Sequence, residues 1–373
     1  MFIYERENWT RFTWSDGEIS DLLARASFLQ GNLLGQLAAF GFEVGKEAGF
    51  LALSQEIVKS NEIEGVLLNT DEVRSSVARR LNVDLKKETP PNHFLDGIVD
   101  MMLDATRNAD KPLTAERLCA WHAALFPTGY SGLTPIKAGR LRDDAQGEMR
   151  VVSYKGSTEI VHYQAPPARD IPSMLDDFCA FMNAQTKMNA FIKAAIAHLW
   201  FVSVHPFEDG NGRIARALTE MVLAKSERTP FRFYNMSGQI QKERKTYYMI
   251  LEMTQRGDGD ITSWLKWFLK MVGTALTTAQ KTVERLSVKA KFWQAHADED
   301  FSSDQRMILN RLLDGTLRGN LTSSRWAKMC KTSQDTASRQ IKILLERDIL
   351  IQIGAGRSTH YELNSERGCN DGL

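Results

Sequence analysis

Residues 205–216 read His205-Pro206-Phe207-Glu208-Asp209-Gly210-Asn211-Gly212-Arg213-Ile214-Ala215-Arg216. Residues 194–204, just before this stretch, are mostly apolar good helix formers, and apolar residues recur at helical spacing through residues 214–225 after it. The stretch is therefore predicted to be a loop between two helices. Pro206 ends the first helix, because its ring removes a hydrogen-bond donor and restricts the residue before it. His205 is left at a helix end, where its side chain can face a ligand.

Gly210-Asn211-Gly212 is suited to binding an anion. Glycine adopts backbone conformations that other residues reach only at a cost, so successive N–H groups can turn toward one point. The N-terminus of the next helix follows directly, and its unpaired N–H groups and dipole also favour negative charge. Arg213 and Arg216 share one face of that helix and can reach the same di- or triphosphate. The stretch therefore predicts a phosphate site.

Asp209 and His205 supply a possible metal ligand and a possible base. A single carboxylate can hold Mg²⁺ beside a phosphate site, because this ion keeps several waters and takes further oxygens from the substrate. His205 is the only proton acceptor of suitable pKa in the stretch, and it could take a proton from an incoming hydroxyl. These residues together indicate nucleotidyl or phosphoryl transfer.

The pattern His-Pro-Phe-x-Asp-Gly-Asn-Gly-Arg-x-x-Arg resembles the signature of Fic-domain enzymes, and every position matches. The resemblance implies a mainly α-helical fold and transfer of AMP from Mg·ATP to a Ser, Thr or Tyr hydroxyl of a protein, including the chain itself. It implies that His205 is the base, Asp209 the Mg²⁺ ligand and Phe207 an apolar anchor for the loop. The implied nucleotide-binding residues of the stretch are Gly210, Asn211, Gly212, Arg213 and Arg216.

Ser60-Asn61-Glu62-Ile63-Glu64-Gly65 ends a helix that is predicted over residues 47–63. Alone, this segment would be a helix end with surface carboxylates. Beside the signature, it resembles the inhibitory helix of self-restrained Fic proteins, in the subgroup that carries this helix before the Fic domain. The resemblance implies that Ser60 fixes the segment. It also implies that Glu64 forms a bidentate pair with Arg216, so that ATP binds in a pose unsuited to attack.

Residues 131–167 contain glycines, turns and short β-branched runs. Residues 150–153 and 159–163 are predicted to be strands of a hairpin that turns at Lys155-Gly156-Ser157. The hairpin resembles the flap of Fic proteins, which lies over the active site and aligns the target's backbone by strand addition. We do not expect His162 to be catalytic, because His205 already supplies the base. The implied nucleotide-side residues of the flap are Ile160, Val161, His162 and Tyr163.

Further helices follow the signature, over residues 243–248 and 260–269. Tyr247 and Tyr248 resemble the family's adenine- and ribose-contacting pair. Gln255 stands near the place where relatives often have Asn, and it is the third implied contact. Residues 286–295 are predicted to be a connecting segment. Helical periodicity in the first half of the chain predicts helices over residues 19–42, 69–83, 94–105, 114–125 and 176–183.

Three helices are predicted near the C-terminus, over residues 306–313, 323–330 and 334–347. A glycine-turned hairpin over residues 349–363 follows, and the whole resembles a winged helix-turn-helix. Between residues 303 and 364 there are ten Lys and Arg against six Asp and Glu. This excess is compatible with DNA binding, but such modules also serve as dimer or protein docking surfaces. The side chains expected to be exposed on the third helix are Gln334, Ser338, Arg339 and Lys342.

The chain is therefore predicted to have three parts. Residues 1–85 form an N-terminal helical module with the inhibitory helix, residues 86–288 the Fic domain, and residues 300–373 the winged-helix-like domain. The charges and prolines of residues 86–92 mark the first boundary. A hydrophobic content of 43% in 373 residues is ample for sizeable cores.

The net charge of +1 and the pI near 7.7 predict no general affinity for polyanions. The N-terminus lacks a secretory signal and no apolar run is long enough to span a bilayer, so we expect no membrane partner and a cytoplasmic protein. Widely spaced cysteines predict reduced thiols and no metal site; they are Cys119, Cys179, Cys330 and Cys369.

Several alternatives stay open at this point. Gly212 follows Asn211 where the kinase-like Doc relatives carry lysine, which argues against phosphotransfer. Removal of AMP is possible, since Glu64 could orient a water. A DNA-binding regulator that only senses ATP is a further alternative, against which the complete signature speaks. A homodimer is also possible.

Overall fold

The computed structural model describes residues 1–364 except 86, 146, 157 and 230, with the backbone alone at 154, 155 and 357. The chain forms two compact units, residues 1–280 and 281–373. Helices dominate both units, so the mainly α class is confirmed. The division into three parts stays a prediction.

Eleven helices lie wholly or partly in the described residues of the first unit. Asparagine and threonine side chains accept backbone N–H groups at the starts of several of them, with Asn69, Asn92, Thr114 and Asn189 as the capping residues. The helices are α1 (Asp16–Phe40), α2 (Phe42–Ile63), α3 (Thr70–Leu81), α4 (His93–Arg107), α5 (Ala115–Leu125), α6 (Ile171–Asn183), α7 (Ala190–Val204), α8 (Asn211–Glu227), α9 (Met236–Lys242), α10 (Arg244–Gln255) and α11 (Thr262–Ala295), with 3₁₀ turns at Ile3–Glu5 and Ala168–Asp170.

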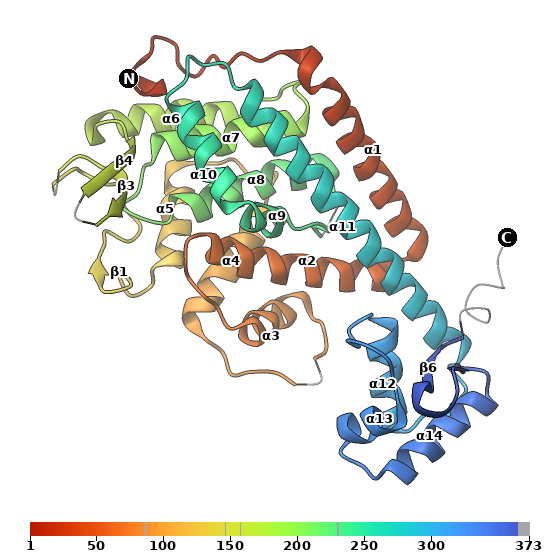
Figure 1. Ribbon diagram of the computed structural model, residues 1–373. Coiled ribbons are helices and arrows are strands. Elements are labelled where there is room, and N and C mark those ends of the chain that lie inside the picture. The colour runs from red at the N-terminus through yellow and green to blue at the C-terminus, as the bar shows by residue number, and fades with distance from the viewer. Residues whose placement is uncertain (86, 146, 157, 230, 365–373) are drawn as a thin grey trace. The chain divides into compact units, whose positions relative to one another are not determined.

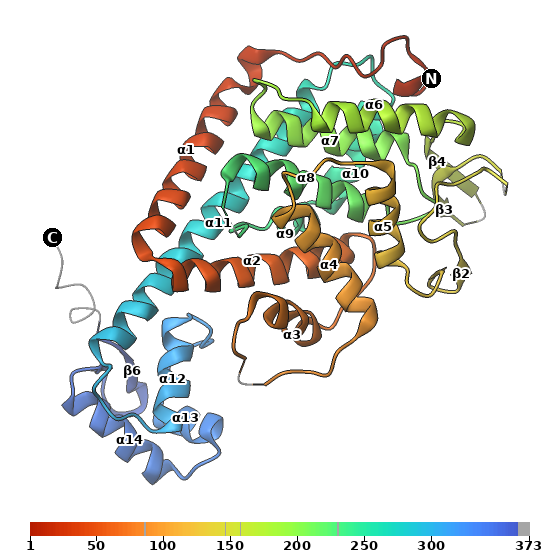
Figure 2. The ribbon, with the colours of Figure 1, turned by 180° about the vertical axis from the view of Figure 1, so that it is seen from behind.

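The helices α7 and α8 form the centre of this unit, and they lie side by side in Figure 1 and Figure 2. Nearly every residue of α7 is buried, because the helix is apolar on all its faces. α2 and α4 pack against α8, and α2 also packs along α9. The loop between α7 and α8 is thus held by two buried helices, and the end of α2 is brought to the start of α8.

α1 and α11 run parallel to each other along one side of the unit (Figure 1). The carboxylate of Glu18 lies 2.7 Å from the ammonium of Lys266 near their starts. Further along, the side chain of Gln280 donates to the backbone oxygen of Leu29 at 3.2 Å. The aromatic residues Trp264 and Trp267 of α11 are buried in the core of the unit.

The strands of the first unit form two antiparallel hairpins, β1 (Tyr130–Ser131) with β2 (Thr134–Pro135) and β3 (Arg150–Lys155) with β4 (Thr158–Gln164). The second hairpin confirms the strands predicted for the flap. The first is too short for its two-residue strands to have been predicted from periodicity.

Residues 286–295, which were predicted to be a connecting segment, form the last part of α11, because this helix continues through Ala295. No glycine or proline interrupts this segment, and its lysines, alanines and aromatic residues tolerate a helix. α9 was also missed, since it has only seven residues and little periodicity.

The described residues of the second unit contain the end of α11, followed by three helices and a hairpin in the expected order. These are α12 (Ser303–Leu313), α13 (Ser323–Cys330), α14 (Gln334–Glu346), β5 (Leu350–Ile353) and β6 (His360–Leu363), with a 3₁₀ turn at Gly356–Ser358. Ser333 caps α14 by accepting from the backbone N–H of Thr336 at 3.1 Å. The core of the unit includes Ile308, Leu309, Trp326, Ile341 and Leu344.

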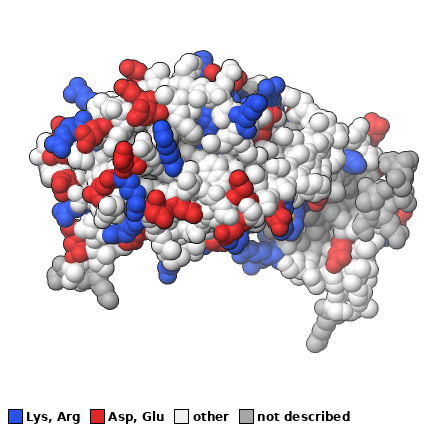
Figure 3. Space-filling model, turned by 90° about the horizontal axis from the view of Figure 1, so that it is seen from above, with Lys and Arg blue, Asp and Glu red and all other residues white. Residues whose placement is uncertain are grey.

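Charges of both signs are interspersed over the face of the molecule that Figure 3 shows. Within the described part of the chain, no helix combines the length and apolar character that crossing a membrane requires. Cys119, Cys179 and Cys330 are free thiols. Cys369 lies outside the described residues.

Candidate active site

The loop between α7 and α8 is held in shape by its own side chains. Asn211 accepts from the backbone N–H of Phe207 at 3.1 Å and donates to the backbone oxygen of Phe207 at 2.8 Å. Phe207 is fully buried and stacks on His122 with ring centroids 4.3 Å apart. Phe207 is therefore an apolar anchor, as expected. The amide of Asn211 is committed to the loop, which leaves its backbone N–H for any anion.

His205 ends α7 in the left-handed conformation, with φ of +50°. Its Nδ1 donates to the backbone oxygen of Val202 at 3.2 Å, because a carbonyl can only accept. In the neutral ring Nε2 is then the unprotonated nitrogen. Burial lowers the pKa of His205 from 6.5 to about 4, so the imidazole is neutral near pH 7. A neutral imidazole with Nε2 free can accept a proton.

Arg142 holds the backbone of the loop from outside, a role that the sequence did not reveal. Its Nε donates to the oxygen of His205 at 2.8 Å, and its backbone N–H donates to the oxygen of Pro206 at 3.1 Å. The guanidinium, which is buried, also contacts the oxygen of Pro166 at 2.5 Å and pairs with Asp144. Sequence periodicity could not have identified this role, because Arg142 is a single arginine in an irregular segment.

Replacing Arg142 by alanine is expected to lower the free energy of unfolding by about 3 kcal/mol, because the backbone oxygens of His205 and Pro166 would each lose a charged hydrogen-bond donor. Arg140→Ala is the matched control, since Arg140 is an exposed arginine two residues earlier. Urea unfolding followed by circular dichroism measures both variants. Equal midpoints for Arg142→Ala and the unchanged protein would show that Arg142 does not support the loop.

The start of α8 presents backbone N–H groups and two buried arginines. Gly210 caps the helix at φ of +80°, and a Cβ there would lie 2.9 Å from the ring of Phe126, so glycine is needed. The Arg213 guanidinium lies 4.7 Å from the centroid of that ring and 3.5 Å from the Asp209 carboxylate. Arg213 Nε and Arg216 Nη1 are buried and have no partner among the described residues. Unpaired buried donors are rare in proteins and fit an anion that is bound here.

The end of α2 lies against Arg216. Arg216 donates from Nε to the Ser60 hydroxyl and from Nη2 to the Ser60 backbone oxygen, both at 2.8 Å. Nη2 also donates to Glu64 Oε1 at 2.8 Å. The structure thus brings together the predicted Ser60, Glu64 and Arg216. The predicted bidentate geometry was wrong, because Glu64 Oε2 instead accepts from the Tyr248 hydroxyl at 3.2 Å.

Gly212 leaves the space that the Glu64 carboxylate occupies. A Cβ at Gly212 would lie 2.1 Å from Glu64 Oε1, which is far inside van der Waals contact. Glu64 therefore places a negative charge directly beside the first turn of α8. The helix start and Arg216 favour an anion at that place, whether it is a carboxylate or a phosphate.

Asp209 offers a carboxylate that is suited to one ligand position of Mg²⁺. The side chain is 42% exposed, and its oxygens contact the Gly210 N–H, the Ser131 hydroxyl and, at 3.5 Å, Arg213. A carboxylate has about four lone-pair positions, so room for an ion remains. Among the described residues, no group of three or more His, Cys, Asp or Glu could hold a metal.

The predicted flap residues differ in their surroundings. Ile160 is 40% exposed, whereas Tyr163 is buried and donates to the backbone oxygen of Ser203 at 2.5 Å. His162 lies between Ser153 and Glu252, with both contacts at 2.7 Å. A nucleotide contact by Val161 or its neighbours stays a prediction.

The two predicted tyrosines on α10 also differ in their surroundings. Tyr247 is buried and its hydroxyl lies 2.8 Å from His198 Nε2. Gln255 is also buried and donates to the Ser203 hydroxyl at 3.2 Å. Tyr248 is 37% exposed and contacts Glu64, which places its ring beside the start of α8. The nucleotide-binding roles of Tyr247, Tyr248 and Gln255 stay predictions.

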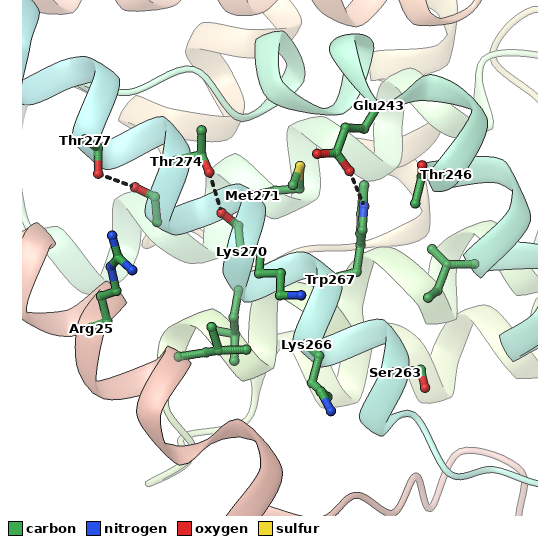
Figure 4. Close-up of a pocket in the computed structure, with 14 residues that line it drawn as sticks. Arg25, Glu243, Thr246, Ser263, Lys266, Trp267, Lys270, Met271, Thr274 and Thr277 are labelled. Carbon is green, nitrogen blue, oxygen red and sulfur yellow. Dashed lines mark hydrogen bonds between the residues drawn. The ribbon is translucent and has the colours of Figure 1, made fainter.

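A separate hollow of about 760 Å³ lies between α1, α10 and α11 (Figure 4). Its rim includes Arg25, Lys266, Lys270 and Glu243, and the side chain of Trp267 donates to Glu243 at 3.3 Å. None of its lining residues belongs to the loop at residues 205–216. The hollow is therefore separate from the candidate active site, which is formed by the loop and the start of α8.

Residues 112–223 match the model of the Fic/DOC family, and this range includes the whole loop. The chain carries a Fic domain. Residues 2–83 match a domain of unknown function (DUF4172), and residues 316–364 match the C-terminal domain of a DIP2311-like transcriptional regulator. Each of the three ranges lies within one of the three predicted parts, whose boundaries stay predictions.

Curated relatives and solved structures agree with the Fic domain. Proteins named protein adenylyltransferase Fic from Culex quinquefasciatus and Aedes aegypti are each 28% identical, over 218 and 221 residues. Each match covers 57% of this chain and 39% of the relative. A Fic family protein from Desulfovibrio desulfuricans has a TM-score of 0.54 at 19% identity, covering 93% of this chain and 96% of that chain. A Fic domain containing signaling protein from Bacteroides thetaiotaomicron has a TM-score of 0.51 at 17% identity, covering 72% and 98%. These two likenesses show the fold.

Proposed function

We propose that this chain is a nucleotidyltransferase that moves AMP from Mg·ATP to a Ser, Thr or Tyr hydroxyl of a protein, and that Glu64 restrains it. The observation that carries the proposal is the pair of buried, unpartnered donors, Arg213 Nε and Arg216 Nη1, at the start of α8. They lie beside a helix N-terminus in a Fic domain whose signature is complete. A triphosphate matches this set of donors in charge and in number of oxygens.

In the proposed reaction the chain positions two reactants and moves one proton. His205 Nε2 accepts the proton of the target hydroxyl as the hydroxyl oxygen forms a bond to the α-phosphorus. The bond from that phosphorus to the β-phosphate oxygen breaks, and pyrophosphate leaves. Arg213, Arg216 and the first N–H groups of α8 hold the β- and γ-phosphates throughout. The protein acts through orientation and charge and forms no covalent intermediate of its own.

Asp209 would hold Mg²⁺ in this site, since its carboxylate is accessible and lies next to the phosphate cradle. When bound, the ion neutralises part of the triphosphate charge and fixes the phosphate oxygens. Arg142 keeps the backbone of His205 and Pro206 in place, so that Nε2 stays where the hydroxyl arrives.

The proposed restraint follows from competition for one guanidinium. Glu64 Oε1 accepts from the Arg216 Nη2 that would otherwise serve the γ-phosphate. Ser60 holds the same guanidinium through its hydroxyl and its backbone oxygen, so the arginine is turned toward α2. ATP that binds beside this pair loses a contact and with it the alignment for attack.

Mass spectrometry tests the reaction class directly. The purified chain is incubated with Mg·ATP and an extract of its host, and tryptic peptides are analysed. A gain of one AMP on a hydroxyl side chain is expected. A gain of a single phosphate would instead support phosphotransfer, and loss of AMP from a previously adenylylated protein would support AMP removal.

We further propose that the second unit binds duplex DNA through α14. Gln334, Ser338, Arg339 and Lys342 are all exposed on this helix, while Ala337, Ile341 and Leu344 face the core of the unit. In winged helix-turn-helix domains, the helix that contacts the bases usually has one polar, basic face that does not pack against the core of the domain. The match of residues 316–364 to the C-terminal domain of a transcriptional regulator supports the proposal.

Arg339→Glu is expected to abolish DNA retention, because the change puts a negative charge where a phosphate or base edge would lie. The assay is a gel shift with mixed duplex fragments at low salt. Arg318→Glu is the matched control, since Arg318 is exposed in the loop between α12 and α13 and the change of charge is the same. Equal loss in both variants would indicate unspecific attraction. If the unchanged protein does not shift the DNA fragments, the result would favour a role of the second unit in docking to a protein.

A further inference from the structure

Strand β4 of the flap contains a β-bulge at His162. Val151 of β3 pairs with Tyr163, and the next residue, Val152, pairs with Val161. His162 is therefore the extra residue that has no counterpart on β3. A bulge interrupts the ladder, bends the strand and turns the side chain of the extra residue to a new direction.

The imidazole of His162 joins the flap to α10. Its Nε2 lies 2.7 Å from the Ser153 hydroxyl on β3, and its Nδ1 lies 2.7 Å from Glu252 Oε2 on α10. The bulge makes this bridge possible, because it turns the side chain away from the regular alternation of the strand. The two strands of the flap and the helix thus meet at one ring.

Arg256, the residue after the end of α10, holds the backbone of the bulge. Its Nη2 donates to the oxygens of Val161 at 2.7 Å and His162 at 3.1 Å. Its Nε lies 3.4 Å from Glu252 Oε1, and its guanidinium lies 5.0 Å from the centroid of Phe2. A segment that pairs with β4 would have to displace this guanidinium in order to use either carbonyl group. The exposed residues of β4 before the bulge are Thr158, Glu159 and Ile160.

A residue on the same face of α10 also contacts the carboxylate of Glu64. Tyr248, Glu252 and Arg256 follow each other at intervals of four, so they lie in one row along the helix. Tyr248 contacts Glu64 at one end of the row, and Glu252 and Arg256 contact the flap at the other end. The row therefore connects the start of α8 with strand β4 of the flap.

We propose that His162, Glu252 and Arg256 form a latch that fixes the flap bulge on α10 and so sets which part of β4 a target segment can pair with. The inference rests on the proposed transfer of AMP to a protein. The three residues position the target hydroxyl relative to His205 through their contacts within the flap and α10. A segment that ends its pairing at the bulge is held in one register, and the register decides which hydroxyl arrives at Nε2.

The latch is not needed for folding. The side chains of His162, Glu252 and Arg256 are 36%, 33% and 43% exposed, and ion pairs this open to solvent contribute little to stability. Their loss should therefore appear in the use of the target and in the motion of the flap, while the fold and the affinity for ATP stay the same.

The test uses the full chain with Glu64→Gly as background and the chain itself as target. Glu252→Gln and Arg256→Gln are added singly, and Lys245→Gln, an exposed residue of the same helix, is the matched control. Rates of AMP incorporation, the KM for ATP and the occupancy of each modified residue are measured by peptide mass spectrometry. Hydrogen exchange of residues 158–164 reports on the flap independently of activity.

Both latch variants are expected to lower incorporation at the main residue by about ten-fold and to spread AMP over other residues, with the KM for ATP unchanged. Exchange over residues 158–164 should be faster, Arg256→Lys should restore part of the selectivity, and Lys245→Gln should change neither. Unchanged site occupancy and exchange in both latch variants would overturn the latch alone. Absence of any incorporation by the Glu64→Gly background would overturn the proposed function, and the latch with it.

Discussion

Replacing Glu64 by glycine is expected to raise the rate of AMP transfer by about ten- to a hundred-fold. The carboxylate accepts a hydrogen bond from Arg216 Nη2 at 2.8 Å, and such a bond to a charged group is worth about 1.5 to 3 kcal/mol. Its removal frees the guanidinium for the γ-phosphate and removes a negative charge from the start of α8. The measurement is the initial rate of AMP incorporation at saturating Mg·ATP.

Glu62→Gly is the matched control for this variant. Glu62 lies two residues earlier at the end of α2, but its carboxylate contacts Lys59 and Gln241 and no arginine of the site. The same glycine at that place should leave the rate unchanged. An equal rise in both variants would mean that loosening of the helix end, and not the Glu64 carboxylate, controls the site.

Replacing His205 by alanine in the Glu64→Gly background is expected to lower AMP transfer by about a hundred- to ten-thousand-fold, the usual range for loss of a general base. ATP binding should stay close to normal, because Nε2 acts on the target hydroxyl and the phosphates are held by α8. Initial rates and equilibrium binding of ATP are measured side by side.

His93→Ala is the control for a histidine that is exposed and remote in sequence from the loop. It should change neither rate nor binding. Retained turnover in His205→Ala would refute the assignment of the base. Loss of ATP binding together with turnover would show that His205 supports the loop rather than the proton transfer.

Much of the site could be predicted from sequence because its chemistry is local. Residues 205–216 are consecutive, so the order of a helix end, a glycine-rich turn and a helix start is set by neighbouring residues. The contact between Glu64 and Arg216 is not local, and only the resemblance to self-restrained Fic proteins allowed it to be predicted. The structure places these two side chains 2.8 Å apart.

What could not be predicted depends on packing between distant segments. Arg142 reaches the backbone of His205 from an irregular stretch, and Glu64 fits beside Gly212 only because the glycine has no Cβ. The two tyrosines of α10 are neighbours in sequence, yet the helix turns Tyr247 into the core and Tyr248 toward Glu64. Sequence periodicity gives no distances of this kind.

We propose that the site at the start of α8 transfers AMP and that Glu64 restrains it through Arg216. The most direct test supplies the Glu64→Gly protein with ATP that carries radioactive phosphorus in either the α- or the γ-position, alongside the unchanged protein and Glu64→Gly/Arg216→Ala. We expect strong labelling of protein from α-labelled ATP by Glu64→Gly, weak labelling by the unchanged protein and none by the double variant. Labelling from γ-labelled ATP, or equal labelling by all three proteins, would contradict the proposal.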